Sequence, residues 1–219
     1  MSEARTDILT AIRSSGHAGG FAAAIAAEAG ALLADPSVCR PMLPTGALAD
    51  IFIARVTSPK VAASAERIDG LADVPAAVAR YLTAQNLAHD IALQPDAALR
   101  SADWRSFSTH KSISADETAA VGRALWGIAE TGSLVFHSGP TCPTLFAFLP
   151  LHHIVVVEAA NILPYLEDYS IVAAGLPIPR NVNFITGPSG TTDIEGTLVR
   201  GAHGPACLHV IVVGSEVGN

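Results

Sequence analysis

Residues 154–157 read Ile-Val-Val-Val, a run in which every side chain is β-branched and none is polar. Such a run is typical of a strand that is covered on both faces, as the strands of a parallel sheet are. Residues 208–213, Leu-His-Val-Ile-Val-Val, have nearly the same character. We therefore expect two buried strands at the centre of a layered α/β fold.

Shorter segments on either side of these runs complete the predicted sheet. Strands are expected at residues 61–67, 90–93, 131–136 and 183–186, and helices at residues 73–84, 114–125 and 161–174. Asp73, Ser114 and Asn161 are residue types that cap helix N-termini, and Glu117 follows Ser114 at capping-box spacing. Residues 104–110 favour no element. The alternation of strands and helices predicts a largely parallel sheet with flanking helices.

The first 58 residues have a different pattern. Helical periodicity covers residues 6–13, 21–34 and 48–56, with serine and glycine between the segments. The pattern predicts a helical N-terminal extension, residues 1–58, packed on an α/β domain of residues 59–219. The apolar run 21–34 is too short to span a bilayer, and the N-terminus lacks the order of charges of a secretory signal. We expect a cytoplasmic protein without membrane insertion.

Charge and cysteine content exclude several classes of partner and cofactor. A formal net charge of −7, with 13 Lys and Arg residues, argues against nucleic-acid binding. Cys39, Cys142 and Cys207 lack the spacing of zinc or iron–sulfur ligands and indicate reduced thiols, although Cys142 beside a Gly-Pro turn is also a candidate nucleophile. Neighbours on a strand face opposite sides, so His152 and His153 predict no metal site.

Residues 187–192, Gly-Pro-Ser-Gly-Thr-Thr, follow one predicted strand and precede a predicted helix, with Thr192 and Glu195 at capping-box spacing. Backbone N–H groups and hydroxyls at such a junction suit a small anionic ligand at the carboxyl edge of a parallel sheet. A tight turn that caps a helix is the alternative. The candidate ligand-binding residues are Gly187, Ser189, Gly190, Thr191, Thr192 and Asp193.

Two further segments contain candidate catalytic groups. In residues 201–205, Gly-Ala-His-Gly-Pro, His203 can carry a proton, with Gly204 as a ligand contact, or it can bond a carbonyl. In residues 129–133, Ala-Glu-Thr-Gly-Ser, Glu130 can act as nucleophile or base, or it can cap or pair structurally. Thr131, Gly132 and Ser133 are then candidate ligand contacts.

Together the segments 129–133, 187–195 and 201–205 resemble the LUD domain, the family of lactate utilization protein C, over roughly residues 61–213. The resemblance implies a fold similar to that of ribose-5-phosphate isomerase and the CoA transferases, preceded by helices. It also implies a role in the oxidation of L-lactate to pyruvate together with iron–sulfur partner proteins. No cofactor is expected on this chain, so the clusters belong to the partners.

The sequence departs from the family pattern at two positions. Members often carry arginine where this chain has Gly190 and a small apolar residue where it has Thr192, so a bidentate partner for the anion is missing here, and Arg180 and Arg200 are the candidates to replace it. Three functions follow as hypotheses: a lactate-utilization subunit, a stand-alone enzyme on an acyl-CoA or a phosphorylated small acid, and a non-catalytic anion-binding domain.

Overall fold

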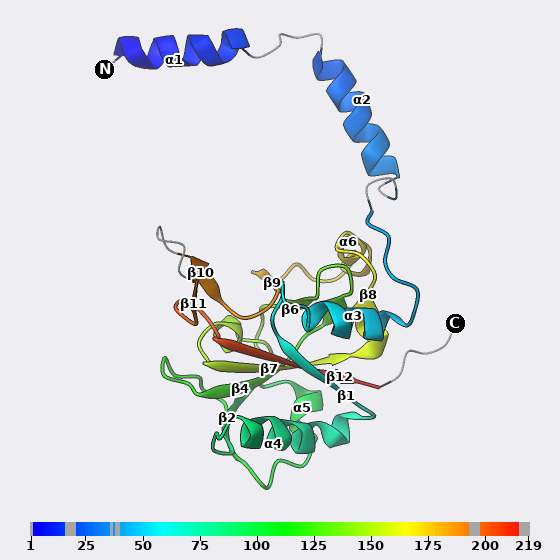
Figure 1. Cartoon of the computed structure of the whole chain (residues 1–219), viewed down its shortest axis with the longest axis vertical. Coiled ribbons are helices and arrows are strands. Elements are labelled where there is room, and N and C mark those ends of the chain that lie inside the picture. Colours follow the sequence, from blue (N-terminus) through cyan, green and yellow to red (C-terminus); the bar gives the residue numbers. More distant parts are fainter. Residues whose placement is uncertain (1, 16–20, 36, 38–39, 193–197, 215–219) are drawn as a thin grey trace. The chain divides into compact units, whose positions relative to one another are not determined.

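The computed structural model describes residues 2–15, 21–35, 37, 40–192 and 198–214, which form two compact units, Met1–Met42 and Leu43–Asn219 (Figure 1). The first unit contains α1 (Ser2–Ser15) and α2 (Phe21–Ala34). The second contains every other element, including α3 (Leu48–Val56), whose Ala49, Phe52 and Val56 are buried. No helix within the described ranges is long and apolar enough to cross a membrane.

The centre of the second unit is a six-stranded sheet with the order β1-β12-β7-β4-β2-β3. Its strands are β1 (Ser64–Ile68), β2 (Asp90–Leu93), β3 (Ser108–His110), β4 (Ala119–Arg123), β7 (His152–Glu158) and β12 (Cys207–Val213). Every neighbouring pair is parallel. The two β-branched runs therefore lie side by side near the middle, which confirms the prediction of an α/β fold with a buried parallel sheet.

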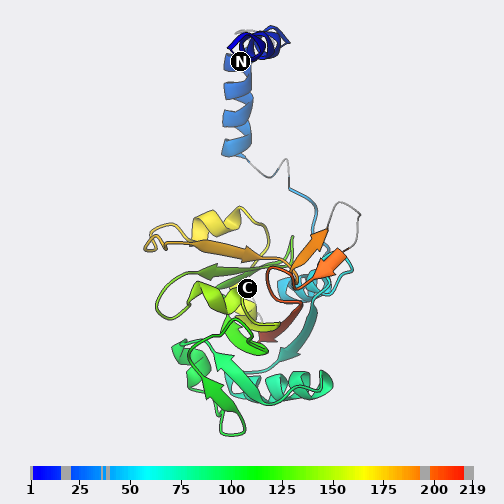
Figure 2. The same ribbon diagram turned by 90° about the vertical axis from the view of Figure 1, so that its left-hand side faces the viewer.

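Alternating side chains of the central strands enter two separate cores. Ile154, Val156 and Ile211 pack beneath α4 (Val74–Ala84) and α5 (Ala97–Arg100), while Val155 and Val210 pack with α3 on the opposite face. Figures 1 and 2 show these layers on the two sides of the sheet. Because both faces are covered, the strands have no polar side, as their sequence predicts.

A second sheet of four strands has the order β8-β5-β6-β9. It consists of β5 (Trp126–Ile128), β6 (Ser133–His137), β8 (Ile162–Leu163) and β9 (Val182–Ile185), and β6 is antiparallel to both of its neighbours. These strands are inserted in the crossovers from β4 to β7 and from β7 to β12. The segment 183–186 is therefore a strand, as predicted, but an edge strand of the smaller sheet.

Three predicted helices are wrong in whole or in part. Residues 114–125 contain β4, although the Ser114 amide does donate to Glu117 Oε2 at 3.4 Å in the predicted capping-box contact. Residues 161–174 contain β8 and only a short helix, α6 (Asp168–Val172). The helix expected after residue 192 is replaced at its described ends by an antiparallel hairpin of β10 (Gly190–Thr192) and β11 (Leu198–Arg200). Asp193 and Glu195 lie outside the described residues.

Candidate functional site

A cavity of about 300 Å³ brings together the segments 187–190 and 203–205. Its lining combines glycine backbone, two imidazoles and two hydroxyl side chains with an apolar wall. The lining residues are Ala147, Phe148, His153, Phe184, Ile185, Thr186, Gly187, Pro188, Ser189, Gly190, His203, Gly204, Pro205 and Leu208. We call this the motif cavity. Apolar walls with a few convergent polar groups are typical of small-molecule sites.

Backbone contacts hold the two segments together. The Ser189 amide donates to the Pro205 carbonyl at 2.7 Å, and the Gly201 amide donates to the Ser189 carbonyl at 3.1 Å. Gly187 has φ +79°, and a Cβ at that position would collide with the Val61 carbonyl oxygen. Position 187 therefore requires glycine for two reasons: the backbone has a positive φ angle, and the backbone of Val61 lies too close for any side chain.

The electrostatic character of the motif cavity comes from imidazole and hydroxyl groups, since its described lining contains no lysine or arginine. His153 is fully buried, and burial lowers its pKa to about 4, so it is neutral at physiological pH. Its Nδ1 has no hydrogen-bond partner among the described residues. His203, by contrast, is exposed. The cavity can therefore offer a neutral donor–acceptor group on its inner wall and a second, exposed imidazole at its surface.

The motif cavity does not lie at the carboxyl edge of the parallel sheet, where the sequence placed it. His153 and Leu208 are the second residues of β7 and β12, so the cavity lies at the amino-terminal ends of these strands. The reason is that the 187–190 turn follows β9, which belongs to the second sheet. The expected site over a helix N-terminus is also absent at Gly190, Thr191 and Thr192, because these residues form β10.

Glu130 is not among the residues that line the motif cavity. Its Oε2 accepts a hydrogen bond from the Leu166 amide at 3.1 Å. The neighbouring Ser133 does approach the cavity: its hydroxyl lies 2.7 Å from Thr131 Oγ1 and 2.6 Å from Thr186 Oγ1, and Thr186 is a lining residue. Gly132, with φ +73°, makes the turn between them possible. The segment 129–133 thus supports the cavity through Ser133, while the roles predicted for Glu130 and His203 stay predictions.

The two arginines considered as replacements at position 190 lie in different places. Arg200 is the β-ladder partner of Gly190 across the hairpin, and side chains at paired positions of an antiparallel ladder project to the same face. Arg180 lines a different cavity, at the opposite end of the six-stranded sheet. Arg200 is therefore the arginine whose backbone pairs with a lining residue of the motif cavity, and its own side chain is not among the lining residues.

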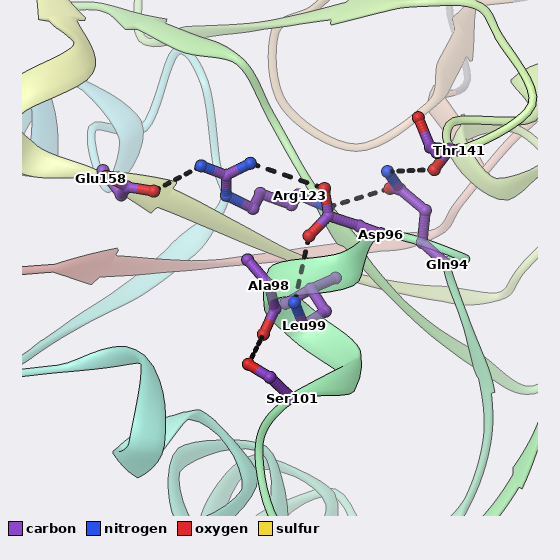
Figure 3. Close-up of polar contacts among 8 residues, drawn as sticks. All are labelled: Gln94, Asp96, Ala98, Leu99, Ser101, Arg123, Thr141 and Glu158. Atoms are coloured by element: carbon purple, nitrogen blue, oxygen red, sulfur yellow. Dashed lines mark hydrogen bonds and ion pairs between the residues drawn. The ribbon is translucent and has the colours of Figure 1, made fainter.

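A polar cluster that the sequence analysis missed occupies the carboxyl edge of the sheet (Figure 3). Arg123, the last residue of β4, contacts both Asp96 and Glu158, and Gln94 connects the ends of β2 and β4. A signal was available, because Gln94, Asp96, Arg123 and Glu158 are polar residues at or just after the ends of apolar segments. Assigning residues 114–125 to a helix concealed it.

The adjacent histidines of β7 face opposite sides of the sheet, as predicted. His152 Nδ1 lies 2.9 Å from the Tyr81 hydroxyl in the layer beneath α4, and the His153 ring packs 5.7 Å from Phe136 on the other face. Tyr81 also stacks on His209 at 4.3 Å. Within the part of the chain that the structure describes, no three His, Cys, Asp or Glu side chains are grouped to hold a metal ion.

The fold and its cavities define an α/β protein with a parallel sheet, an inserted smaller sheet and candidate sites at both sheet edges. Residues 94–213 match the LUD domain family, and the chain belongs to that family. It is 36% identical over 117 residues to lactate utilization protein C of Geobacillus thermodenitrificans, covering 50% of this chain and 49% of the relative. It is 33% identical over 118 residues to lactate utilization protein C of Bacillus subtilis, covering 51% of this chain and 49% of the relative. The chain thus spans about half the length of these curated relatives.

A solved structure shares the fold. It is the crystal structure of a DUF162 family protein from Deinococcus radiodurans, with a TM-score of 0.58 and 21% sequence identity over 78% of this chain and 100% of that chain. At this identity the similarity concerns the arrangement of the elements alone.

Proposed function

We propose that this protein is a lactate-utilization component that holds a small carboxylate, L-lactate or pyruvate, in the motif cavity. The observation that carries the proposal is the convergence of the segments 187–190 and 203–205 on one cavity that also contains the buried, neutral His153. The names of the relatives in the same family supply the metabolic context.

The motif cavity suits the chemistry of a 2-hydroxy or 2-oxo acid. Its volume of about 300 Å³ is at the small end of ligand sites. The Ser189 hydroxyl and an N–H of the His203 imidazole can donate hydrogen bonds to a carboxylate, and the neutral imidazole of His153 can accept one from a hydroxyl. The apolar residues Ala147 and Leu208 are suited to contact a methyl group.

Oxidation of L-lactate to pyruvate releases two electrons and two protons, and the electrons require an acceptor. Its three cysteines are too few for a four-thiolate iron–sulfur cluster. Of the two described cysteines, Cys142 lines the cavity that also contains Arg180, at the carboxyl edge of the six-stranded sheet, and Cys207 begins β12 at the opposite edge. We therefore assign the electron-carrying clusters to iron–sulfur partner proteins, with this chain in a substrate-handling or assembly role.

Thermal unfolding in the presence of L-lactate or pyruvate tests the ligand half of the proposal. A ligand that binds only the folded chain raises Tm as its concentration increases. We expect this rise in the native chain and its loss in Ser189→Ala. The control is Ser101→Ala, an exposed serine whose hydroxyl bonds only the nearby Ala98 carbonyl. An unchanged Tm, or an equal rise in Ser189→Ala, would contradict the assignment.

Copurification tests the partner half separately. A tagged chain, expressed in its own host during growth on lactate, is expected to retain cysteine-rich iron–sulfur proteins. Deletion of the chain is expected to slow growth on lactate and to leave growth on glucose unchanged. A solitary protein whose deletion has no effect on lactate growth would count against the metabolic role, whatever the result of the binding test.

A further inference from the structure

A second cavity, of about 470 Å³, lies at the carboxyl edge of the six-stranded sheet and goes beyond the function proposed above. Its lining residues are Gln94, Asp96, Arg123, Leu125, His137, Ser138, Gly139, Thr141, Cys142, Leu176, Pro177, Ile178, Pro179 and Arg180. From β2 the chain moves outward to β3, whereas from β4 it moves the other way, through β7 to β12. The direction thus reverses between β2 and β4, and open α/β sheets bind ligands at the carboxyl ends of strands at such a switch point.

Gln94 forms the floor of this carboxyl-edge cavity and is only 3% exposed. Its Oε1 accepts the Arg123 amide at 2.9 Å, and its Nε2 donates to the Thr141 carbonyl at 2.9 Å. Both ends of the amide are therefore occupied, and they tie the ends of β2 and β4 to the 139–142 loop. A Cβ at Gly122 would approach Gln94 Oε1 to 2.9 Å, so this position too is shaped around the amide.

Charged groups of both signs line the same space. Asp96 is oriented by two contacts: its Oδ1 accepts the Leu99 amide at 3.0 Å, and its Oδ2 lies 3.5 Å from Arg123 Nη1 (Figure 3). Arg123 is held from the other side by Glu158. Arg180 is exposed, and it forms no hydrogen bond or ion pair with another described residue. The cavity thus offers one oriented carboxylate and one guanidinium that is not neutralised within the described chain.

We propose that the carboxyl-edge cavity is a second ligand site, which takes an organic anion that also carries hydroxyl groups. The anionic end pairs with the Arg180 guanidinium, and a hydroxyl donates to the Asp96 carboxylate that Arg123 and Leu99 hold in place. Leu125, Leu176 and Ile178 enclose the carbon chain between the two ends. The described lining of the motif cavity contains no lysine or arginine, so the two sites differ in the charged groups that they present.

The test uses the free thiol of Cys142, which lines the cavity, as a reporter of occupancy. Burial raises the pKa of this thiol to about 11, and Asp96 adds to the effect, so alkylation by iodoacetamide is slow and is measured at about pH 9. The probe is glycerol 3-phosphate, compared with glycerol and with inorganic phosphate. Mass spectrometry gives the rate at Cys142, with Cys207 of the same chain as the internal reference.

We expect glycerol 3-phosphate at ten times its Kd to slow alkylation of Cys142 about elevenfold and to leave Cys207 unaffected. The protection should be lost in Arg180→Gln and weakened in Asp96→Asn, where asparagine can still accept the Leu99 amide. Arg200→Gln, an exposed arginine of β11, is the matched control and should keep full protection. Each variant is compared with and without probe, because Asp96→Asn changes the thiol itself.

Three results would overturn the proposal. The first is an absence of protection by glycerol 3-phosphate in the native chain. The second is protection that survives Arg180→Gln. The third is equal protection by inorganic phosphate or by glycerol alone, because the site requires both the anion and the hydroxyl.

Discussion

Gly204 lies directly against Ser189: a Cβ at position 204 would lie 3.1 Å from Ser189 Cβ and 3.4 Å from its Oγ. The two residues belong to segments that are separated in sequence and joined by the hydrogen bond from the Ser189 amide to the Pro205 carbonyl. Position 204 therefore controls where the Ser189 hydroxyl lies in the motif cavity.

Substitution Gly204→Ala should weaken carboxylate binding more than it weakens the fold. The added methyl group must push the Ser189 side chain by a few tenths of an ångström, and we expect a loss of about tenfold in affinity, or about 1.4 kcal/mol. Calorimetric titration with L-lactate measures this. Gly70→Ala is the matched control, because its Cβ would meet only Asp73 Oδ2, at 3.8 Å. Equal affinities in the two variants would contradict the role given to Gly204.

Substitution Gly187→Ala should destabilise the second unit by roughly 3 kcal/mol or more, since it combines backbone strain with a collision at the Val61 carbonyl oxygen. Gly175→Ala separates the two effects, because Gly175 has φ +81° but no atom within 4 Å of an added Cβ. The Gly175→Ala variant should therefore lose only about 1 kcal/mol of unfolding free energy, which comes from backbone strain alone. Urea unfolding of the two variants measures the difference, and similar losses would show that the approach of Val61 is unimportant.

Substitution Ser133→Ala should cost about 1–3 kcal/mol of unfolding free energy, because the residue is 3% exposed and its hydroxyl contacts both Thr131 and Thr186. It should also weaken ligand binding, because Thr186 loses a contact that positions it in the cavity lining. Thr131→Ala, which removes the outer hydroxyl and a methyl group but leaves the contact between Ser133 and Thr186, should have the smaller effect on both measurements. If Thr131→Ala reduces stability and ligand binding more than Ser133→Ala does, then Ser133 is not the residue that supports the cavity lining at Thr186.

Acidification should destabilise the fold partly through His153. Burial lowers its folded-state pKa to about 4, below the ordinary value of 6.5, so the unfolded chain takes up the proton first as pH falls. Its contribution to stability is complete above about pH 6.5 and is lost progressively down to about pH 4. By pH 5 the loss is about 2 kcal/mol. Unfolding free energies at pH 7.5 and pH 5 should therefore differ less in His153→Gln than in the native chain.

The remaining histidines serve as an internal control for that measurement. Burial also lowers the pKa values of His137, His152 and His209, and these residues are unchanged in the variant. A pH dependence of stability identical in the native chain and in His153→Gln would show that His153 is protonated freely in the folded state.

The buried strands were predictable because nearly all of their side chains are apolar on both faces, as expected for strands that are covered on both sides. Residues 154–157 are all apolar and residues 208–213 contain a single polar side chain, His209, and the structure places the two runs in adjacent parallel strands with Ile154 beside His209. The helix α4 was predictable from a cap-type residue at Asp73 and from Pro75 in its first turn, although the Asp73 side chain makes no capping hydrogen bond. In these segments local preference and tertiary contacts agree.

The missed elements are those in which tertiary pairing overrides a local pattern. Residues 119–122 are a short apolar run that fits a helix or a strand, and hydrogen bonding of β4 to β2 and β7 decides for the strand. Ile162 and Leu163 likewise pair with β5 instead of continuing a helix from Asn161. Periodicity within a single segment contains no information on such partners.

The sequence predicted which segments meet at the candidate site, but it did not predict at which edge of the sheet they meet. The segments 187–190 and 203–205 do converge, and Ser133 reaches them through Thr186, whereas Glu130 bonds the Leu166 amide instead. The predicted edge of the sheet was wrong because the chain forms more than one sheet, and no local feature shows that β9 belongs to the four-stranded one. The cluster at Gln94, Asp96 and Arg123 was missed for the related reason that β4 was assigned to a helix.

The most direct test of the motif cavity is the imidazole NMR spectrum of the native chain during titration with L-lactate or pyruvate. We predict that the resonances of His203 and His153 shift saturably with a common Kd. His89, which stacks on Phe107 beside β3, should not shift. Resonances of His203 and His153 that stay fixed throughout both titrations, or that move no more than that of His89, would contradict a carboxylate site at this cavity.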